Sequence, residues 1–231
     1  MSGVTQKSKT KKRKRLYFLA LLRYNKKRER KVTFLTKAER LDYLLNEDNG
    51  YLIVGKALTL DVSKTYVREY IQKRGLVKVA HGIYKSDEVW DDDLYVLGLR
   101  NEKMIYSHDT ALMLQGLTER EPSRIYVSVP QGYNATHLRK NGIEVHQVKV
   151  EHICLGITEA ITVYGNKVVT YDMERSICDL LKVRNDRDTQ MFSYALKEYV
   201  KRNDKNLSRL TKYAEILGVS DDLRLYMAVL L

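Results

Sequence analysis

The stretch VSKTYVREYIQKRGLVKVAHGIYKS, residues 62–86, constrains the fold more than any other part of the chain. Ser63 is placed as an N-cap, and the apolar residues that follow have the spacing of a buried helical stripe: Val67, Tyr70 and Ile71. Gly75 is typical of a helix C-cap, and short apolar runs on both sides of Gly82 indicate a hairpin. An amphipathic helix therefore leads directly into two short strands.

Two further helices are predicted before this stretch. Thr36 and Glu39 have the spacing of a capping box at the start of the first one. A shorter helix covers residues 54–60, and Asp61 follows where the chain must turn, since aspartate tolerates the left-handed conformation. Three helices and a hairpin predict a winged helix-turn-helix over residues 32–86.

The basic charge is divided unevenly along the chain. Of a formal net charge of +12, residues 1–31 alone contribute 13 Lys and Arg against Glu29. We expect this tail to be mostly disordered, with a marginal helix over the apolar residues 16–22. That apolar run is too short for a membrane span and lacks the cleavage site of a signal peptide. Elsewhere the charges balance, but residues 55–85 hold seven basic residues against two acidic ones, so the predicted winged helix is locally basic.

Residues 87–231 predict a second domain of mixed α+β structure that ends in helices. Alternating apolar residues are typical of strands in four stretches: residues 104–107, 124–130, 143–150 and, as a hairpin turning at Gly165-Asn166, 162–171. Helices are predicted up to Leu99 and in five further stretches: residues 109–117, 173–184, 189–202, 206–217 and 221–231. Asp172 and Asn206 suit N-caps of two of these helices. The fold class is therefore α+β, with a winged helix-turn-helix joined to a mixed α+β domain.

Candidate DNA-reading residues gather on the outward face of the predicted third helix. Arg and Lys can donate to guanine, Gln can pair with adenine, and the start of a helix reaches the major groove. The matching side chains are Lys64, Thr65, Arg68 and Gln72. Phosphate contacts are predicted for Lys56, Lys78, His81 and Lys85. Any solvated helix carries such residues, and Glu69 would repel phosphate, but helix, hairpin and local charge together favour nucleic acid.

Catalytic and metal-binding signals are weak. The five histidines lack HExxH-like spacing, and the chain contains no GxSxG, P-loop or GxGxxG motif. Asp172, Glu174 and Asp179 could be nuclease ligands, yet the first suits an N-cap, the second suits a helix dipole, and the last two do not share a helical face. His108 is better explained as a helix cap with an anchored imidazole, and Cys178 as a core residue. We therefore expect no enzyme activity, no metal and no cofactor.

Four separate stretches carry a resemblance to a known family: GLVKVAHGIY at 75–84, IYSHDTALMLQGL at 105–117, IYVSVPQGYNATHL at 125–138 and YDMERSICDLL at 171–181. In this order they resemble the AbiEi antitoxins, the regulators of AbiE abortive-infection systems, which are bacterial type IV toxin-antitoxin pairs. The resemblance runs from about Thr36 to Leu231 and leaves out the basic tail.

The resemblance implies a winged helix that represses its own operon by binding promoter inverted repeats. It also implies a C-terminal domain that counteracts a nucleotidyltransferase-like toxin without requiring a stable complex. The recognition segment would be Ser63 to Arg74 and the wing Leu76 to Lys85. Six motif residues would belong to the antitoxin domain: Ser107, His108, Asp172, Glu174, Arg175 and Asp179. The chain departs from the pattern at Asp61, where such turns often have Gly, and in its extra tail.

Two other functions stay open. One is a transcription factor whose second domain senses a ligand or partner, and the other is a nuclease guided by the winged helix. The two cysteines, Cys154 and Cys178, form neither a disulfide framework nor a CxxC motif, which suits a reducing compartment. The sequence therefore predicts a cytoplasmic antitoxin and autorepressor whose partners are double-stranded DNA and a toxin, with no membrane contact.

Overall fold

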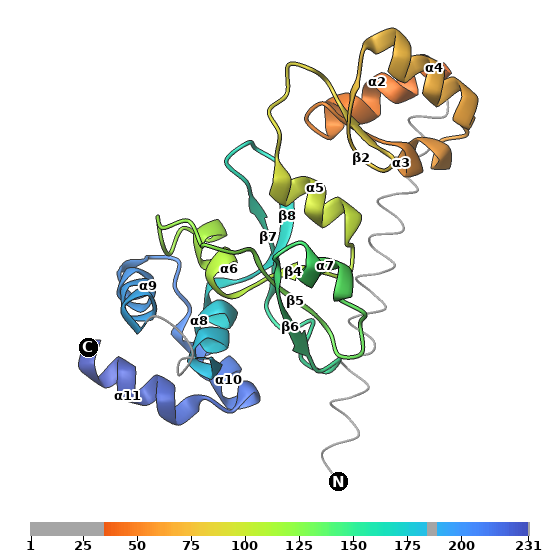
Figure 1. The fold of residues 1–231 in the computed structure, drawn as a ribbon. Helices are drawn as coiled ribbons and strands as arrows, with labels where there is room; N and C mark the ends of the chain where they lie inside the picture. Colours follow the sequence, from red (N-terminus) through yellow and green to blue (C-terminus); the bar gives the residue numbers. More distant parts are fainter. Residues whose placement is uncertain (1–34, 184–188, 231) are drawn as a thin grey trace. The chain divides into compact units, whose positions relative to one another are not determined.

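The computed structural model describes residues 35–183 and 189–230. Within them the chain has a mixed α+β fold that divides into two compact units between Asp91 and Asp92 (Figure 1). None of the helices in these residues has both the length and the apolar surface needed to cross a membrane. The predictions of a disordered tail over residues 1–31, and of a helix within it, fall outside the described residues.

The unit boundary lies later than the one predicted after residue 86. The connecting residues pack with the first unit, because the Tyr51 hydroxyl donates to the Trp90 carbonyl at 3.0 Å. Asp92 instead belongs to the second unit, where its carboxylate accepts from the Tyr95 backbone N–H at 2.9 Å and caps a helix. The neighbouring residues Asp91 and Asp92 therefore belong to different units.

In the described residues the first unit combines three helices with a three-stranded antiparallel sheet. Its elements are α2 (Lys37–Glu47), β1 (Tyr51–Ile53), α3 (Val54–Thr59), α4 (Lys64–Arg74), β2 (Val77–Ala80) and β3 (Ile83–Lys85). β3 pairs with both β1 and β2. The predicted helices and hairpin are confirmed. β1 was not predicted, since three residues carry no alternation and only the edge of β3 makes them a strand.

Local caps fix both ends of α4, as predicted. The Ser63 hydroxyl accepts from the Tyr66 backbone N–H at 3.3 Å, and Gly75 ends the helix with a φ of +62°. Asp61, in the turn before the helix, has the expected left-handed φ of +56°. The helix packs its apolar stripe into a core formed by Leu41, Leu44, Leu52, Ala57, Val62, Val67 and Tyr70.

The second unit is built around a mixed five-stranded sheet in the order β6-β5-β4-β8-β7. Its elements are α5 (Asp93–Arg100), β4 (Ile105–Tyr106), α6 (His108–Leu114), β5 (Tyr126–Pro130), α7 (Thr136–Lys140), β6 (Glu144–Val148), β7 (Ile157–Ile161), β8 (Lys167–Tyr171), α8 (Met173–Lys182), α9 (Thr189–Lys201), α10 (Leu207–Leu217) and α11 (Ser220–Leu230). β4 and β8 are parallel neighbours. Their carboxyl ends therefore meet at one edge of the sheet, where α6 and α8 begin.

The hairpin of β7 and β8 corrects one prediction. β7 ends at Ile161, and residues 162–165, predicted as a strand, form the turn instead. The Asp92 carboxylate accepts from the Thr162 hydroxyl at 2.5 Å and from the Asn166 side-chain amide at 2.8 Å. This buried acceptor lies 70 residues before Thr162 in the chain, so a local alternation pattern could not reveal it.

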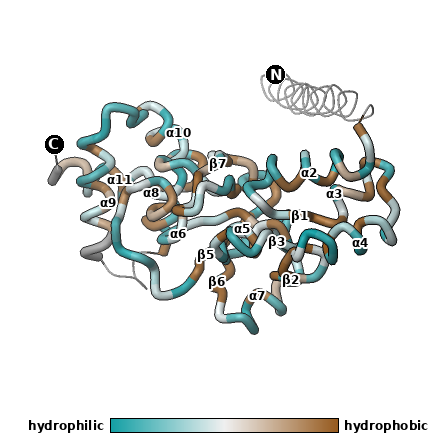
Figure 2. Tube along the Cα trace, turned by 90° about the horizontal axis from the view of Figure 1, so that it is seen from above, coloured by the Kyte–Doolittle hydropathy of each residue, from teal (hydrophilic) through white to brown (hydrophobic). Residues whose placement is uncertain are grey.

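α8 lies at the centre of the helical end of the second unit, and α9, α10 and α11 gather beside it (Figure 1). The shared core includes Leu112, Ile177, Cys178, Leu181, Leu196, Tyr199, Leu210 and Ala214. Hydrophobic stretches can be followed in both units (Figure 2). The four helices predicted after residue 172 are confirmed, whereas α7 was not predicted, because five residues are too few to show a helical period.

Candidate functional site

The outward face of α4 is open to solvent. Its buried residues are Val67 and Tyr70, and the predicted DNA-reading side chains on the other face are all exposed: Lys64, Thr65, Arg68 and Gln72. Ser63 is also exposed, with its hydroxyl used as the helix cap. An exposed helix with donors from its first turn onward has the shape and chemistry that major-groove contacts need.

The hairpin β2–β3 carries two more of the predicted residues, Lys78 and His81, and both are exposed. Its turn is held to the rest of the unit, because the Val54 backbone N–H donates to the Gly82 carbonyl at 2.9 Å. Gly82 itself has a φ of +71°, which a residue without Cβ adopts readily. The hairpin is thus anchored at its turn while its basic side chains stay free for phosphate.

Lys85 does not belong to this surface, which corrects the sequence prediction. Only 10% of its side chain is exposed, its ammonium donates to the Val89 carbonyl, and it lies 3.4 Å from the Asp91 carboxylate. In β3 the alternation turns Ile83 and Lys85 toward the buried side. Lys85 therefore fastens the connecting segment to the first unit rather than contacting DNA.

Two other basic side chains of the first unit are engaged in ion pairs. Lys56 is 46% exposed and lies 2.7 Å from the Asp48 carboxylate, while Arg74 pairs with Asp42. The same Asp42 carboxylate accepts from the Tyr70 hydroxyl at 2.6 Å and so joins α2 to α4. Exposed ion pairs are worth little and exchange easily, so Lys56 can still meet a phosphate.

Four basic residues of the region, Lys64, Arg68, Lys73 and Lys78, are exposed and make no ion pair within residues 35–183 and 189–230. Lys73 was not singled out from the sequence. Its signal was its place directly after Gln72, in the last turn of an exposed basic helix. These four charges can meet phosphates without breaking an ion pair.

Five residues of the second motif set follow the ends of β4 and β8, and the sixth, Asp179, lies further along α8. Ser107 and His108 are buried at the start of α6, and the His108 Nδ1 lies 2.9 Å from the Ser107 Oγ. The imidazole also stacks on His146 of β6, with 3.8 Å between ring centroids. The expected anchoring of His108 is confirmed, although Ser107, at the N-cap position, makes no side-chain capping bond.

Arg175 is buried in the first turns of α8, where it binds the segment that follows β6. Its Nε lies 2.9 Å from the Asp179 carboxylate, and Nη1 donates to the carbonyls of His152 and Leu155 at 2.8 and 3.0 Å. The guanidinium also lies over the Tyr171 ring, 4.3 Å from its centroid. His108 therefore contacts β6 through His146, and Arg175 contacts the loop that follows β6.

Asp172 and Glu174 form a second buried network with α9 and α10. Asp172 caps α8 through the Arg175 backbone N–H at 2.8 Å. Glu174 is fully enclosed and accepts from the Tyr199 hydroxyl at 3.1 Å and from the Asn206 backbone N–H at 3.0 Å. Arg209 lies above both carboxylates, 3.7 Å from Asp172 and 3.5 Å from Glu174.

Burial sets the proton affinities of these groups. Desolvation raises the pKa of the Asp172 carboxyl to about 6 despite the capping N–H, and raises the pKa of Asp179 despite Arg175. Desolvation also raises the pKa of the Cys178 thiol to about 12, which keeps it protonated in the core. The thiol is therefore inert at neutral pH, as expected for a core cysteine.

The motif residues do not converge on an open site. Among the described residues no group of three or more His, Cys, Asp or Glu side chains is arranged to hold a metal ion. Glu174 and Asp179 differ in their partners, the former facing α9 and α10 and the latter facing Arg175. Sequence reasoning missed the partners Tyr199, Arg209 and Tyr213, the last of which donates its hydroxyl to the Asp172 carboxylate at 3.4 Å, since no spacing relates them to the motif. Only Asn206 gave a signal, as a helix cap.

A comparison with models of protein families finds none that matches this chain, and a comparison with curated proteins finds no match either.

Proposed function

We propose that the protein is an antitoxin and autorepressor of a bacterial type IV toxin-antitoxin operon, acting in the cytoplasm. Its first unit is a winged helix-turn-helix that binds inverted repeats in the promoter, with α4 as recognition helix and β2–β3 as wing. The second unit counteracts a nucleotidyltransferase-like toxin without catalysis. The resemblance to the AbiEi antitoxins suggests the toxin partner, while the DNA-binding part rests on geometry.

One observation carries the DNA-binding proposal: α4 has an exposed polar face and leads through Gly75 into an anchored basic hairpin. The order of three helices and a hairpin suits a winged helix, and β1 adds the third strand that such a sheet commonly has. Lys64 and Arg68 lie one turn apart and are free of ion pairs within residues 35–183 and 189–230. These features support base contacts by α4 and phosphate contacts by Lys73 and Lys78.

The DNA-binding proposal is tested by titrating the promoter fragment of the protein's own operon in a mobility-shift assay. We expect the double variant Lys64→Ala with Arg68→Ala to bind at least roughly thirtyfold more weakly, since each base contact contributes about 1–3 kcal/mol. A matched control removes two exposed charges from the second unit, Arg124→Ala with Lys201→Ala. Equal binding by both double variants would contradict the assignment of α4.

The antitoxin proposal is tested by expressing the neighbouring toxin from a promoter that this protein does not bind. The full chain is supplied as wild type or as the Lys64→Ala, Arg68→Ala variant. We expect both to restore growth, because toxin antagonism resides in the second unit and not in repression. If neither chain restores growth, the protein is a repressor only, and if only the wild type does, rescue depends on the first unit; either result contradicts the proposal for the second unit.

A nuclease is the weaker alternative. Its candidate ligands are enclosed, with 1% of the Glu174 side chain and 5% of the Asp179 side chain exposed. A phosphodiester and its metal ions need access to such carboxylates. Mg²⁺-dependent cleavage of operator DNA that disappears in Asp179→Ala, while binding persists, would favour the nuclease.

A further inference from the structure

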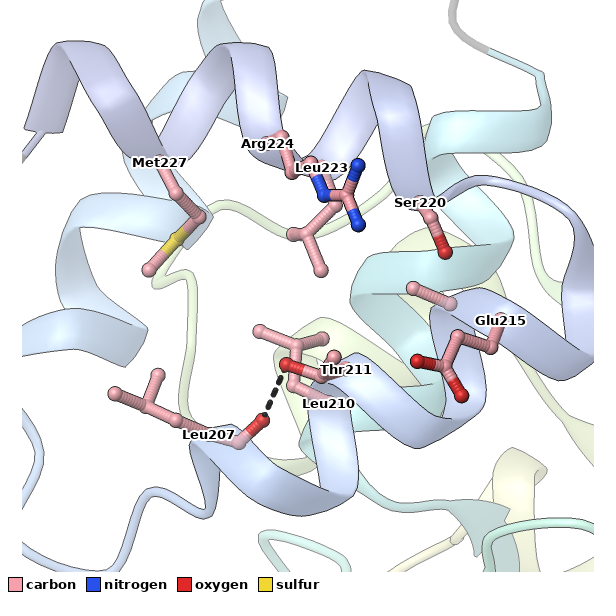
Figure 3. Close-up of a pocket in the computed structure, with 9 residues that line it drawn as sticks. Leu207, Leu210, Thr211, Glu215, Ser220, Leu223, Arg224 and Met227 are labelled. Carbon is pink, nitrogen blue, oxygen red and sulfur yellow. Dashed lines mark hydrogen bonds between the residues drawn. The ribbon is translucent and has the colours of Figure 1, made fainter.

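α10 and α11 enclose an open groove of about 250 Å³ (Figure 3). Its floor is apolar and made by buried side chains: Leu210, Ala214 and Leu223. Its two walls have the helical spacing of three or four residues, with Leu207, Thr211 and Glu215 on α10 and Ser220, Arg224 and Met227 on α11. Two helices with such a groove between them present a face on which other helices can pack.

The two walls run in opposite directions, because Gly218, with a φ of +71°, turns the chain sharply between the helices. Leu207 and Met227 consequently lie at one end of the groove, and Glu215 and Ser220 lie at the other (Figure 3). Leu207 is 42% exposed although it is a large apolar residue. The groove is therefore apolar at one end and charged toward the other.

We propose that a second copy of this chain covers the groove, through its own α10 and α11. A two-fold axis parallel to the groove sets α10 of each copy on α11 of the other. Leu207 then meets the partner's Met227, and Glu215 lies within reach of the partner's Arg224. Each contact occurs twice, so the surface is complementary to itself in both its apolar and its charged parts.

The charges select this arrangement over the other two-fold pairing. An axis across the groove would set Arg224 against the partner's Arg224, and like charges facing each other are unfavourable. Within one chain, among residues 35–183 and 189–230, the ion pair of Arg224 is with Asp221, at 3.6 Å, and both side chains are highly exposed. Such a pair is weak, so Arg224 is free to turn to a carboxylate across the interface.

The contact is small, which sets its strength. Two helices of 11 residues present a face of roughly 16 Å by 20 Å. Stable interfaces bury about 800 Å² on each partner, so this dimer is weak and forms in a concentration-dependent way. The inference does not depend on DNA binding or toxin antagonism.

The test is sedimentation velocity of the full chain from about 1 µM to about 200 µM, the range that brackets a weak dimer. We expect the wild type to pass from monomer to dimer over this range. Glu215→Arg and Arg224→Glu should each weaken dimerisation at least about tenfold, because each opposes like charges across the interface. Lys212→Glu reverses an exposed charge on α10 outside the groove and serves as the control.

Two combinations make the result specific. The double variant Glu215→Arg with Arg224→Glu should dimerise like the wild type, and an equal mixture of the two single variants should form a heterodimer. Unchanged far-UV circular dichroism establishes that the exposed substitutions leave the fold intact. A wild type that stays monomeric throughout, a dimer insensitive to both reversals, or a swapped variant that stays monomeric would each overturn the proposal.

Discussion

The helices α4 and α8 are capped in the same way and both carry charged side chains, yet they use them in opposite ways. Ser63 and Asp172 each accept from the backbone N–H three residues on. α4 buries only two of its residues, whereas α8 buries nine, among them Arg175 and charged neighbours. An identical local start therefore leads to an open charged surface in one unit and to a buried charged core in the other.

Arg68 and Arg175 illustrate what this difference teaches. The Arg68 guanidinium is exposed and makes no ion pair within residues 35–183 and 189–230, so it is available to bind a ligand. The Arg175 guanidinium is 1% exposed and is committed to Asp179 and two carbonyl groups, so it stabilises the fold. Both are arginines on capped helices, and only their surroundings separate an exposed side chain from a structural one.

Arg175→Ala should cost about 3–5 kcal/mol in the free energy of unfolding, because the buried Asp179 carboxylate loses its counter-ion. Urea denaturation followed by circular dichroism measures this loss. Adding Asp179→Asn should recover part of it, since the uncompensated charge is removed. A cost below about 1 kcal/mol would mean that water reaches the Arg175–Asp179 ion pair. The difference between the exposed charges of α4 and the buried charges of α8 would then not hold.

Arg68→Ala should reverse this pattern. We expect a loss of about 1–3 kcal/mol in operator binding, with a change in unfolding free energy of no more than about 0.5 kcal/mol. Mobility-shift titration and urea denaturation of the same preparation give the two values. A destabilised variant with unchanged specificity would place Arg68 among the structural residues and remove the distinction between the helices.

Asp172→Asn tests the buried network through pH. The folded pKa of Asp172, about 6, lies above the ordinary value, so the folded state holds this proton more tightly than the unfolded chain. Its contribution is present below pH 4 and is lost as the pH rises through 6. Relative to wild type, the Asn variant should gain about 1–2 kcal/mol between pH 4 and pH 7. Denaturation at several pH values measures the difference, and a flat difference would contradict the assigned shift.

Lys85 and Lys78 provide the smallest contrast. Lys85→Ala should lower the unfolding free energy by about 1 kcal/mol and leave the salt dependence of DNA binding unchanged. Lys78→Ala should leave stability unaltered and reduce the salt slope by about one. Binding titrations at several salt concentrations separate the two. If the salt dependence of DNA binding were the same for both variants, Lys85 would have to be assigned to the proposed DNA-binding surface.

Much of the first unit could be predicted from local signals. Thr36, Ser63 and Gly75 act within one helical turn, and each fixes a helix end where the sequence indicated it. β1 and the inward turn of Lys85 could not be predicted in this way. Both depend on β3, whose pairing partner and buried face are set by residues far away in the chain.

In the second unit, too, local signals predicted the helices, whereas contacts between distant residues could not be predicted. The helices after residue 172 follow from their periods and from the caps Asp172 and Asn206. The turn at Thr162 was misplaced, because the buried Asp92 carboxylate decides it. Nothing in the spacing of YDMERSICDLL indicates that Arg175 binds two carbonyl groups of a loop and that Arg209 lies above two carboxylates.

By itself the sequence determined the caps, the helical periods, the glycine turns and the basic character of residues 55–85, because each depends on residues within a few positions of one another. Only the tertiary structure decided which charges are available. A side chain's burial and its ion pairs depend on segments brought together by folding. Similar arginines on similarly capped helices therefore became part of an exposed surface in one unit and part of the core in the other.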